Sequence, residues 1–130
     1  MMRAIIIQES LKDGELPTDF YGTRVREYKH LLDENTPITI VELAVAERHA
    51  LDAGMALARK LLPRKYYAHL LNDQSMYIAF PDCLVHLDRG DAAGERQAHA
   101  IGQTFEVPLE QMRFLEMFET DHPDDPTRAG

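Results

Sequence analysis

The residues that could carry out chemistry gather in one stretch of the chain, residues 65–89. It contains three of the five tyrosines, two of the six histidines and the only cysteine. Alternate residues of a strand share a face, so Tyr67 and His69 are expected side by side, with Asp73 in the turn that follows. A histidine can act as a base or a ligand near neutral pH. This group is a candidate polar site, although aspartate is also favoured in turns for its backbone hydrogen bonding.

A second candidate pairs the thiol of Cys83 with the imidazole of His86. A nucleophilic cysteine needs its pKa lowered, for example by a neighbouring histidine. The Pro81-Asp82 bend before it could expose the thiol. If a strand begins at Cys83, however, His86 lies on the opposite face of that strand. The favoured interpretation of Cys83 is therefore a small buried thiol.

Metal ligands and cofactor motifs are sparse in this sequence. His86 and Asp88 lie two residues apart and could supply two ligands, but a closed metal site needs three or four. His49 and His99 fall on separate predicted helices, and nothing in the sequence brings them close. The glycine-rich phosphate loops, the zinc-protease motif and the CxxC motif are all missing from the sequence. We therefore expect no metal and no cofactor.

The elements before the candidate stretch follow from the spacing of apolar residues. They are a buried strand at residues 4–7, an exposed edge strand at 23–32, a strand at 38–46 and a helix at 47–62. A short helix is the alternative at residues 23–32. The strand at 38–46 is apolar on both faces, which is typical of a central strand. The helix is expected to bury a stripe that includes Leu51, Met55 and Ala58, with Gly54 packed closely against the sheet.

The candidate stretch itself is predicted to form a central hairpin. Its strands are expected at residues 66–71 and 76–80, with a turn at 72–74, and strand form continues at 84–88 after the bend. A second helix follows at 92–105, with Asp91 as its N-cap and Ile101 and Phe105 among its buried residues. Residues 112–118 could form a last strand, and we expect residues 119–130 to be a disordered acidic tail.

This order predicts an α+β fold in a single domain at residues 1–118. From residue 38 onward it is β-α-β-β-α, the order of a ferredoxin-like unit. The strands before residue 38 would extend one sheet at its edge or replace the weak last strand, and both helices would cover one face of that sheet. We expect Leu51, Met55, Ala58, Ile101 and Phe105 to be buried between the helices and the sheet.

Charge and composition restrict the partners and the compartment. The formal net charge is −8, which disfavours binding to nucleic acid. A single cysteine allows no internal disulfide, which fits a reducing compartment. The sequence has neither a signal-peptide pattern nor the roughly 20 apolar residues of a membrane helix. We therefore expect a cytoplasmic protein without a membrane anchor.

Several segments resemble one protein family. They are AIIIQESLKD at residues 4–13, TIVELAV at 39–45, YYAHLLND at 66–73, YIAFPDCLVHL at 77–87 and GQTFEVPLEQMRF at 102–114. Together they resemble a family of small uncharacterised bacterial proteins that end in a Gly-Ile-Pro-Glu-Glu-Gln-Leu pattern. This chain departs from the pattern with Glu106 in place of the glycine and Leu109 in place of the first glutamate. The resemblance implies no activity, so no catalytic role is transferred from it.

Two classes of function remain open at this point. The first is a small cytosolic interaction or ligand-binding module that self-associates as a homodimer through the uncovered face of its sheet. An alternative to the dimer is that the N-terminal strand and the loop at residues 14–23 cover that face. The second class is a small enzyme that uses His69 with Tyr67 and Asp73, or Cys83 with His86.

Overall fold

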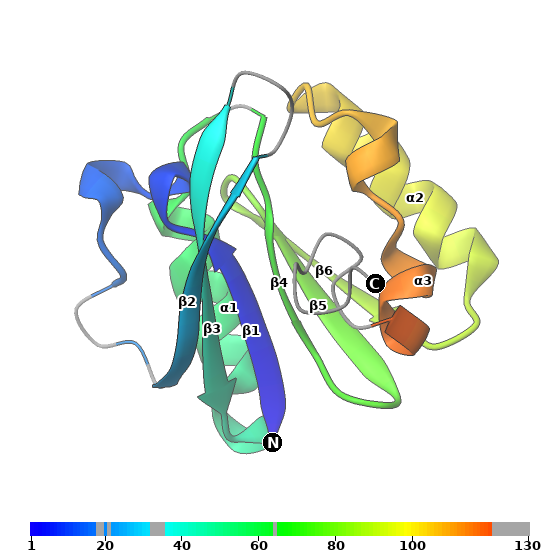
Figure 1. The fold of residues 1–130 in the computed structure, drawn as a ribbon. Helices are drawn as coiled ribbons and strands as arrows, with labels where there is room; N and C mark the ends of the chain where they lie inside the picture. The colour runs from blue at the N-terminus through cyan, green and yellow to red at the C-terminus, as the bar shows by residue number, and fades with distance from the viewer. Residues whose placement is uncertain (18–19, 21, 32–35, 64, 121–130) are drawn as a thin grey trace.

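The fold is a six-stranded sheet with helices on both of its faces (Figure 1). The structure, a computed structural model, describes residues 1–17, 20, 22–31, 36–63 and 65–120. The strands are β1 (Met2–Ile7), β2 (Thr23–Leu31), β3 (Pro37–Val45), β4 (Ala68–Leu71), β5 (Ser75–Phe80) and β6 (Cys83–Asp88). The helices are α1 (Glu47–Lys60), α2 (Ala92–Thr104) and α3 (Phe114–Thr120), with short 3-10 turns η1 (Gln8–Ser10), η2 (Lys12–Gly14) and η3 (Leu109–Gln111). Within the described residues, none of these helices is long and apolar enough to cross a membrane.

The N-terminal strand holds the two halves of the sheet together. The strand order is β2-β3-β1-β4-β5-β6, and all neighbours pair antiparallel. In β1, Ile5 lies opposite Glu42 of β3 on one side and His69 of β4 on the other. Since β1 is antiparallel to both, β3 and β4 run in the same direction, and α1 is the crossover between them. The ferredoxin-like topology is not confirmed, because the first strand of the chain fills the place between β3 and β4.

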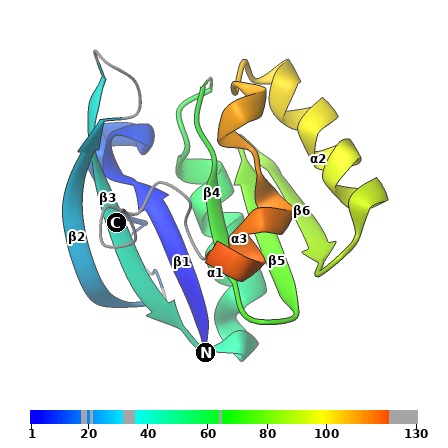
Figure 2. The same ribbon diagram turned by 45° about the vertical axis from the view of Figure 1, so that its right-hand side comes forward.

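The helices lie on opposite faces, and the expectation that both cover one face was wrong (Figures 1 and 2). α1 packs on the face that carries Ala4 and Leu43, and α2 and α3 pack on the face that carries Ile5 and Ile78. The reason is the composition of the inner strands. β3 and β5 are apolar on both faces, so each face has to be covered.

The buried stripe of α1 is rotated from the one expected. Leu57 is 0% exposed, whereas Leu51 is 54% exposed and Met55 36%. Ala58 is buried as expected. The small residues of α1 account for the rotation: Ala50, Ala53, Gly54 and Ala58 allow the helix to approach the sheet closely. A side-chain carbon added at Gly54 would lie 2.9 Å from Leu84 of β6, which confirms the close packing expected there.

On the other face, the two expected core residues of α2 are only partly buried. Ile101 and Phe105 pack against the cluster that contains Phe80, and the Phe80 and Phe105 rings stack with centroids 6.0 Å apart. The N-cap expected at Asp91 is confirmed, because its carboxylate accepts from the Gly94 amide at 2.9 Å.

The end of the described chain is a helix, and the last strand expected at residues 112–118 was wrong. Phe114 and Met117 lie three residues apart and are both buried, as helical spacing requires. The Glu95 carboxylate of α2 accepts a hydrogen bond from the Leu115 amide at 2.8 Å, which satisfies a donor in the first turn of α3. Glu119, expected in the tail, belongs to α3, and residues 121–130 lie outside the described residues.

The stretch at residues 65–89 forms three strands, in agreement with the strand signals at 66–71, 76–80 and 84–88. β4 and β5 form the expected hairpin, but a tight turn at Pro81-Asp82 separates β5 from β6. Asp82 has φ 56°, a left-handed conformation that suits a turn. These strands make up one half of the sheet and end at its β6 edge, so the stretch is not at the centre.

Glu106 ends α2 in an uncommon backbone conformation. Glu106 adopts φ 63°, in the left-handed region that favours glycine. The Glu106 amide donates to the Gln103 carbonyl and the Val107 amide to the Gly102 carbonyl, both at 3.1 Å, which is the Schellman arrangement that ends a helix. The resemblance places a glycine at this position, and the backbone here is one that glycine adopts readily.

The rotation of α1 gives a matched pair of stability measurements. Leu57→Ala should lower the free energy of unfolding by about 2–5 kcal/mol, because it leaves a cavity between α1 and the sheet. Leu51→Ala removes the same atoms from an exposed position and should change it by no more than about 0.5 kcal/mol. Urea denaturation of both variants checks this, and similar losses for the two would mean that α1 is rotated differently.

Candidate functional site

The first group expected from the sequence is only partly assembled. Tyr67 and His69 lie side by side with ring centroids 5.8 Å apart, and His69 is only 2% exposed. The Tyr67 hydroxyl donates to the Gln111 carbonyl at 2.5 Å and so ties β4 to the segment before α3. Asp73 lies apart from them, exposed in the turn between β4 and β5. The structure therefore brings together Tyr67 and His69 but not Asp73, and Tyr67 has a packing role.

The second group is not assembled at all. β6 begins at Cys83, so Cys83 and His86 are on opposite faces of this strand. Cys83 packs against the cluster under α2. His86 lies against the Tyr77 ring with centroids 5.1 Å apart, and its Nε2 is 3.6 Å from Asp88. The thiol and the imidazole do not meet. In the described part of the chain, no group of three or more His, Cys, Asp or Glu side chains could hold a metal ion.

An ion pair between β2 and β3 was not predicted from the sequence. Glu42 of β3 is only 4% exposed and pairs with the guanidinium of Arg26 directly across on β2. That guanidinium also lies 4.8 Å above the Tyr28 ring. The signal was a single carboxylate inside an otherwise apolar strand. A buried carboxylate is costly without its partner, so this pair fixes β2 in register on β3.

A β-bulge in β2 controls where its two nearby arginines point. Arg24 pairs with Leu43, Arg26 pairs with Glu42, and Val25 is the extra residue between them. Without the bulge, Arg24 and Arg26 would share a face of the sheet. With it, Arg24 is on the α1 side and Arg26 on the opposite side. Bulges commonly redirect a side chain in this way next to functional sites.

On the α1 side, Arg24 lies at the rim of a hollow of about 190 Å³. Ile6 of β1 and Val41 of β3 form its floor, and Leu11 and Leu16 form its apolar walls. Its lining is completed by Gln8, Gly14, Glu15 and Arg24. The hollow therefore combines an apolar interior with an amide, a carboxylate and a guanidinium at its rim.

The wall of the hollow is the segment that follows β1. Asp13 and Gly14 both adopt left-handed backbone, with φ 63° and 66°, and turn the chain back over the sheet. The Gln8 amide donates to the Gly14 carbonyl at 3.1 Å and closes this turn. Leu62, beyond α1, donates its amide to the Ser10 carbonyl at 2.8 Å, so the segment is also attached to the end of α1. The alternative in which the N-terminal strand and the loop at residues 14–23 lie across the sheet is not confirmed, because β1 lies within the sheet and part of that loop is outside the described residues.

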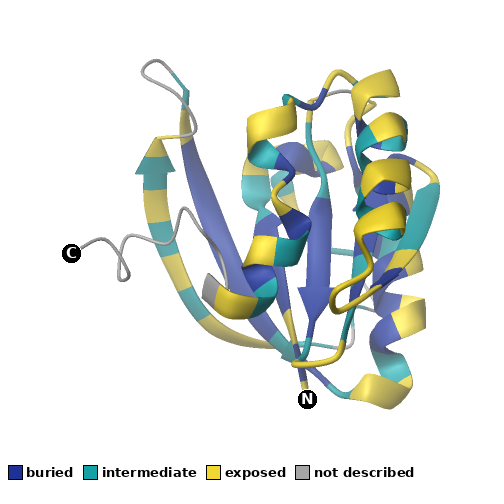
Figure 3. Cartoon of the chain, turned by 90° about the vertical axis from the view of Figure 1, so that its right-hand side faces the viewer, coloured by how far each residue is buried: buried dark blue, intermediate teal, exposed yellow. Residues whose placement is uncertain are grey.

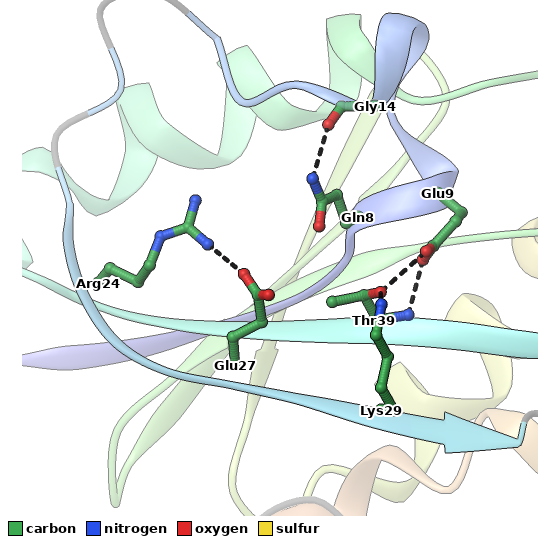
Figure 4. Close-up of polar contacts among 7 residues, drawn as sticks. All are labelled: Gln8, Glu9, Gly14, Arg24, Glu27, Lys29 and Thr39. Carbon is green, nitrogen blue, oxygen red and sulfur yellow. Dashed lines mark hydrogen bonds and ion pairs between the residues drawn. The ribbon is translucent and has the colours of Figure 1, made fainter.

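A chain of polar contacts holds the base of the same segment. One Glu9 carboxylate oxygen accepts from the Thr39 amide at 2.7 Å, and the other accepts from the Thr39 hydroxyl at 2.9 Å (Figure 4). Lys29 of β2 donates to the same hydroxyl oxygen at 2.7 Å. Burial favours the neutral form of Glu9, but these hydrogen bonds and the nearby Lys29 charge together lower the pKa of its carboxyl below the usual value.

The polar groups at the rim still offer hydrogen-bonding capacity. Figure 4 shows Gln8 and the Arg24–Glu27 pair around the same space. Arg24 donates to Glu27 at 2.5 Å, and both side chains are about half exposed. A guanidinium has five donors, and the Gln8 amide has an oxygen besides the nitrogen used on Gly14. The rim can thus donate to an anionic group and accept from a donor group at the same time.

A larger groove of about 590 Å³ lies between α2 and α3. Its central polar residues are engaged in holding α3. His99 Nε2 lies 2.5 Å from the Met112 carbonyl oxygen, and Glu95 accepts from the Leu115 amide at 2.8 Å. Because these groups stabilise the helix packing, the smaller hollow beside β1 is the better candidate site.

Comparisons with family models, with curated proteins and with solved structures gave no match to this chain, so the function has to be inferred from the geometry.

The lowered pKa of Glu9 leads to a pH-dependent prediction. Glu9→Gln should lower the free energy of unfolding by about 1 kcal/mol at pH 7, since charged hydrogen bonds to Thr39 are weakened. The folded pKa is lower than the unfolded value near 4.5, so this contribution is present above pH 4.5 and lost as the pH falls through the folded pKa. Urea denaturation of both proteins from pH 7 to pH 3 should show the difference shrinking. A difference that is constant across this range would contradict the assignment.

Proposed function

We propose that this chain is a binding module for a small amphipathic carboxylate, held in the hollow between β1, β3 and the segment at residues 8–16. The observation that supports it most is the composition of that hollow. Its floor and walls are apolar, and three different polar groups converge on its rim. Sites for small molecules usually combine an apolar lining with a few placed polar groups.

The rim suggests the chemistry of the ligand. Arg24 would bind a carboxylate, which a guanidinium can grip with two parallel hydrogen bonds. Its present partner Glu27 is an exposed residue, and exposed pairs contribute only about 0.2–1 kcal/mol, so the ligand can share or replace it. The Glu15 carboxylate and the Gln8 amide oxygen would accept from an ammonium or hydroxyl group. An apolar amino acid or hydroxy acid has this combination of groups.

The size of the hollow limits the ligand to a small molecule. Pockets for drug-sized molecules have volumes of about 300–1,000 Å³, and this hollow is about 190 Å³. It would hold an amino acid and not a nucleotide. The formal charge of −8 also disfavours ligands that carry several phosphates.

The enzymatic alternative receives less support from the geometry. Cys83 and His86 lie on opposite faces of β6, and Asp73 lies apart from His69. None of the five candidate residues lines the hollow beside β1. We therefore propose ligand binding, and not catalysis, as the function.

The proposal is tested by thermal unfolding with L-leucine, L-methionine and their hydroxy-acid analogues, with leucinamide as the matched ligand that lacks a carboxylate. A ligand at one hundred times its Kd adds about 2.7 kcal/mol of stability, which corresponds to several degrees in Tm. We expect at least one of the acids to raise Tm, and we expect leucinamide to have no effect.

Two variants make this experiment specific. Arg24→Ala should abolish the shift, whereas Arg48→Ala, which removes an exposed arginine of α1, should retain it. No shift with any of the acids, or an equal shift in the Arg24→Ala variant, would refute the proposal.

A further inference from the structure

β2 has an open edge. It is the terminal strand of the sheet, and within the described residues no strand pairs with its outer side (Figure 2). It is nine residues long, and its residues are exposed or half-buried along its whole length, in contrast to the largely buried strand β3 beside it (Figure 3). A long open edge is a template for pairing with another strand.

The apolar residues of β2 are placed symmetrically about its centre. Val25 is 62% exposed and Leu31 is 58% exposed. Each lies three residues from Tyr28. Exposed apolar side chains on a long edge strand favour its pairing with another strand.

The charged residues are placed about the same centre. Glu27 precedes Tyr28 and Lys29 follows it, so opposite charges lie one residue to either side. In an antiparallel pair of identical strands related by a two-fold axis, residues at equal distances before and after the axis face each other. With the axis at Tyr28, Glu27 faces the partner's Lys29, and the bulged Val25 lies at the end of the paired stretch, near the partner's Leu31.

We infer that this chain forms a homodimer in which β2 pairs antiparallel with β2 of a second copy, centred on Tyr28. The second copy is the partner that fits, because the sequence of this edge is complementary to itself in both charge and apolar character. The two sheets would join into one continuous sheet. This inference does not depend on the proposed ligand, because the dimer uses the outer edge of β2 and the hollow lies on one face of the sheet.

The charges favour the register centred on Tyr28 over the neighbouring register centred on Glu27. If the axis were at Glu27, the two Glu27 carboxylates would face each other and Val25 would face the partner's Lys29. In the Tyr28 register the remaining pair is Arg26 with the partner's His30. Arg26 is already paired with the Glu42 carboxylate, so its charge is compensated within its own chain.

The contacts that Glu27 and Lys29 make within their own chain do not prevent β2 from pairing with a second copy. Glu27 accepts from Arg24, and Lys29 donates to Thr39. The Glu27–Arg24 ion pair is exposed and therefore weak, and the Lys29 ammonium has two further donors besides the one that it gives to Thr39. The irregular pairing of β2 with β3 lies between Arg24 and Arg26, at one end of the stretch that would pair, so residues 26–30 remain regular.

The test is sedimentation equilibrium of the full chain with charge-reversal variants. We expect the wild type at tens of micromolar to have twice the 14.9 kDa mass of the chain. Glu27→Lys alone and Lys29→Glu alone should each raise the dimer dissociation constant at least tenfold, because like charges then face each other. The double variant Glu27→Lys with Lys29→Glu should restore the homodimer.

Mixing the two single variants is the decisive step. In a mixed dimer both pairs between positions 27 and 29 are again of opposite charge, so the mixture should dimerise although each variant alone is a monomer. Glu110→Lys, an equal charge change at an exposed residue of η3, should leave the dissociation constant unchanged. The double variant keeps the test valid if a single substitution unfolds the chain. A monomeric wild type, a dimer unaffected by the single variants, or no recovery in either the double variant or the mixture would overturn the inference.

Discussion

The pairing of β1 with both β3 and β4 is the constraint on which the rest of the structure depends. β1 joins a pair of strands, β2 and β3, to a meander of three strands, β4 to β6. Its alternate residues also enter both cores, with Ile6 under α1 and Ile5 under α3. α1 connects two strands that run in the same direction, β3 and β4, and it packs mainly over β4, β5 and β6. Without β1 the two halves would share no hydrogen bonds of the sheet.

The candidate site follows from the same arrangement. The chain leaves β1 between β3 and α1, so the segment at residues 8–16 has to turn over the α1 side of the sheet. This turn forms one wall of the hollow, and β1 and β3 supply its floor. The insertion of β1 also moves β2 to the end of the sheet. The bulge at Val25 then lets β2 place Arg24 at the hollow and Arg26 on the buried Glu42. β2 therefore contributes to the rim of the hollow, fixes its own register on β3 and forms the open edge of the sheet.

The sequence predicted correctly those elements whose residue pattern fits only one type of local structure. The strands at β1, β2 and β3, the β4–β5 hairpin and the N-cap at Asp91 are all confirmed. The choice of face for each helix was not predictable in the same way, because a sheet that is apolar on both sides accepts a helix on either. In α1, two adjacent apolar stripes compete, and the alanine-rich one packs closer to the sheet. The run at residues 112–118 was too short to separate strand from helix.

The site was harder to predict than the fold for a physical reason. The lining of the hollow comes from four segments that meet only after β1 is inserted into the sheet. The spacing of residues along the sequence therefore gives no sign that these four segments meet. Glu42 could have been found, because a carboxylate at an inward position of an apolar strand requires a partner. The Tyr67–His69 neighbours followed from strand alternation, whereas Asp73 was grouped with them on proximity in sequence alone.

Hydrogen exchange of the native protein tests most directly whether β1 holds the sheet together. Amides of β1 that pair with β3 and β4 should exchange only when the whole domain unfolds, so Ala4, Ile5 and Ile6 should be among the slowest in the chain. Their exchange should be as slow as that of Ile78 in the buried strand β5. If β1 exchanges much faster than β5, then β1 opens while the rest of the sheet stays folded, and its central role would be contradicted.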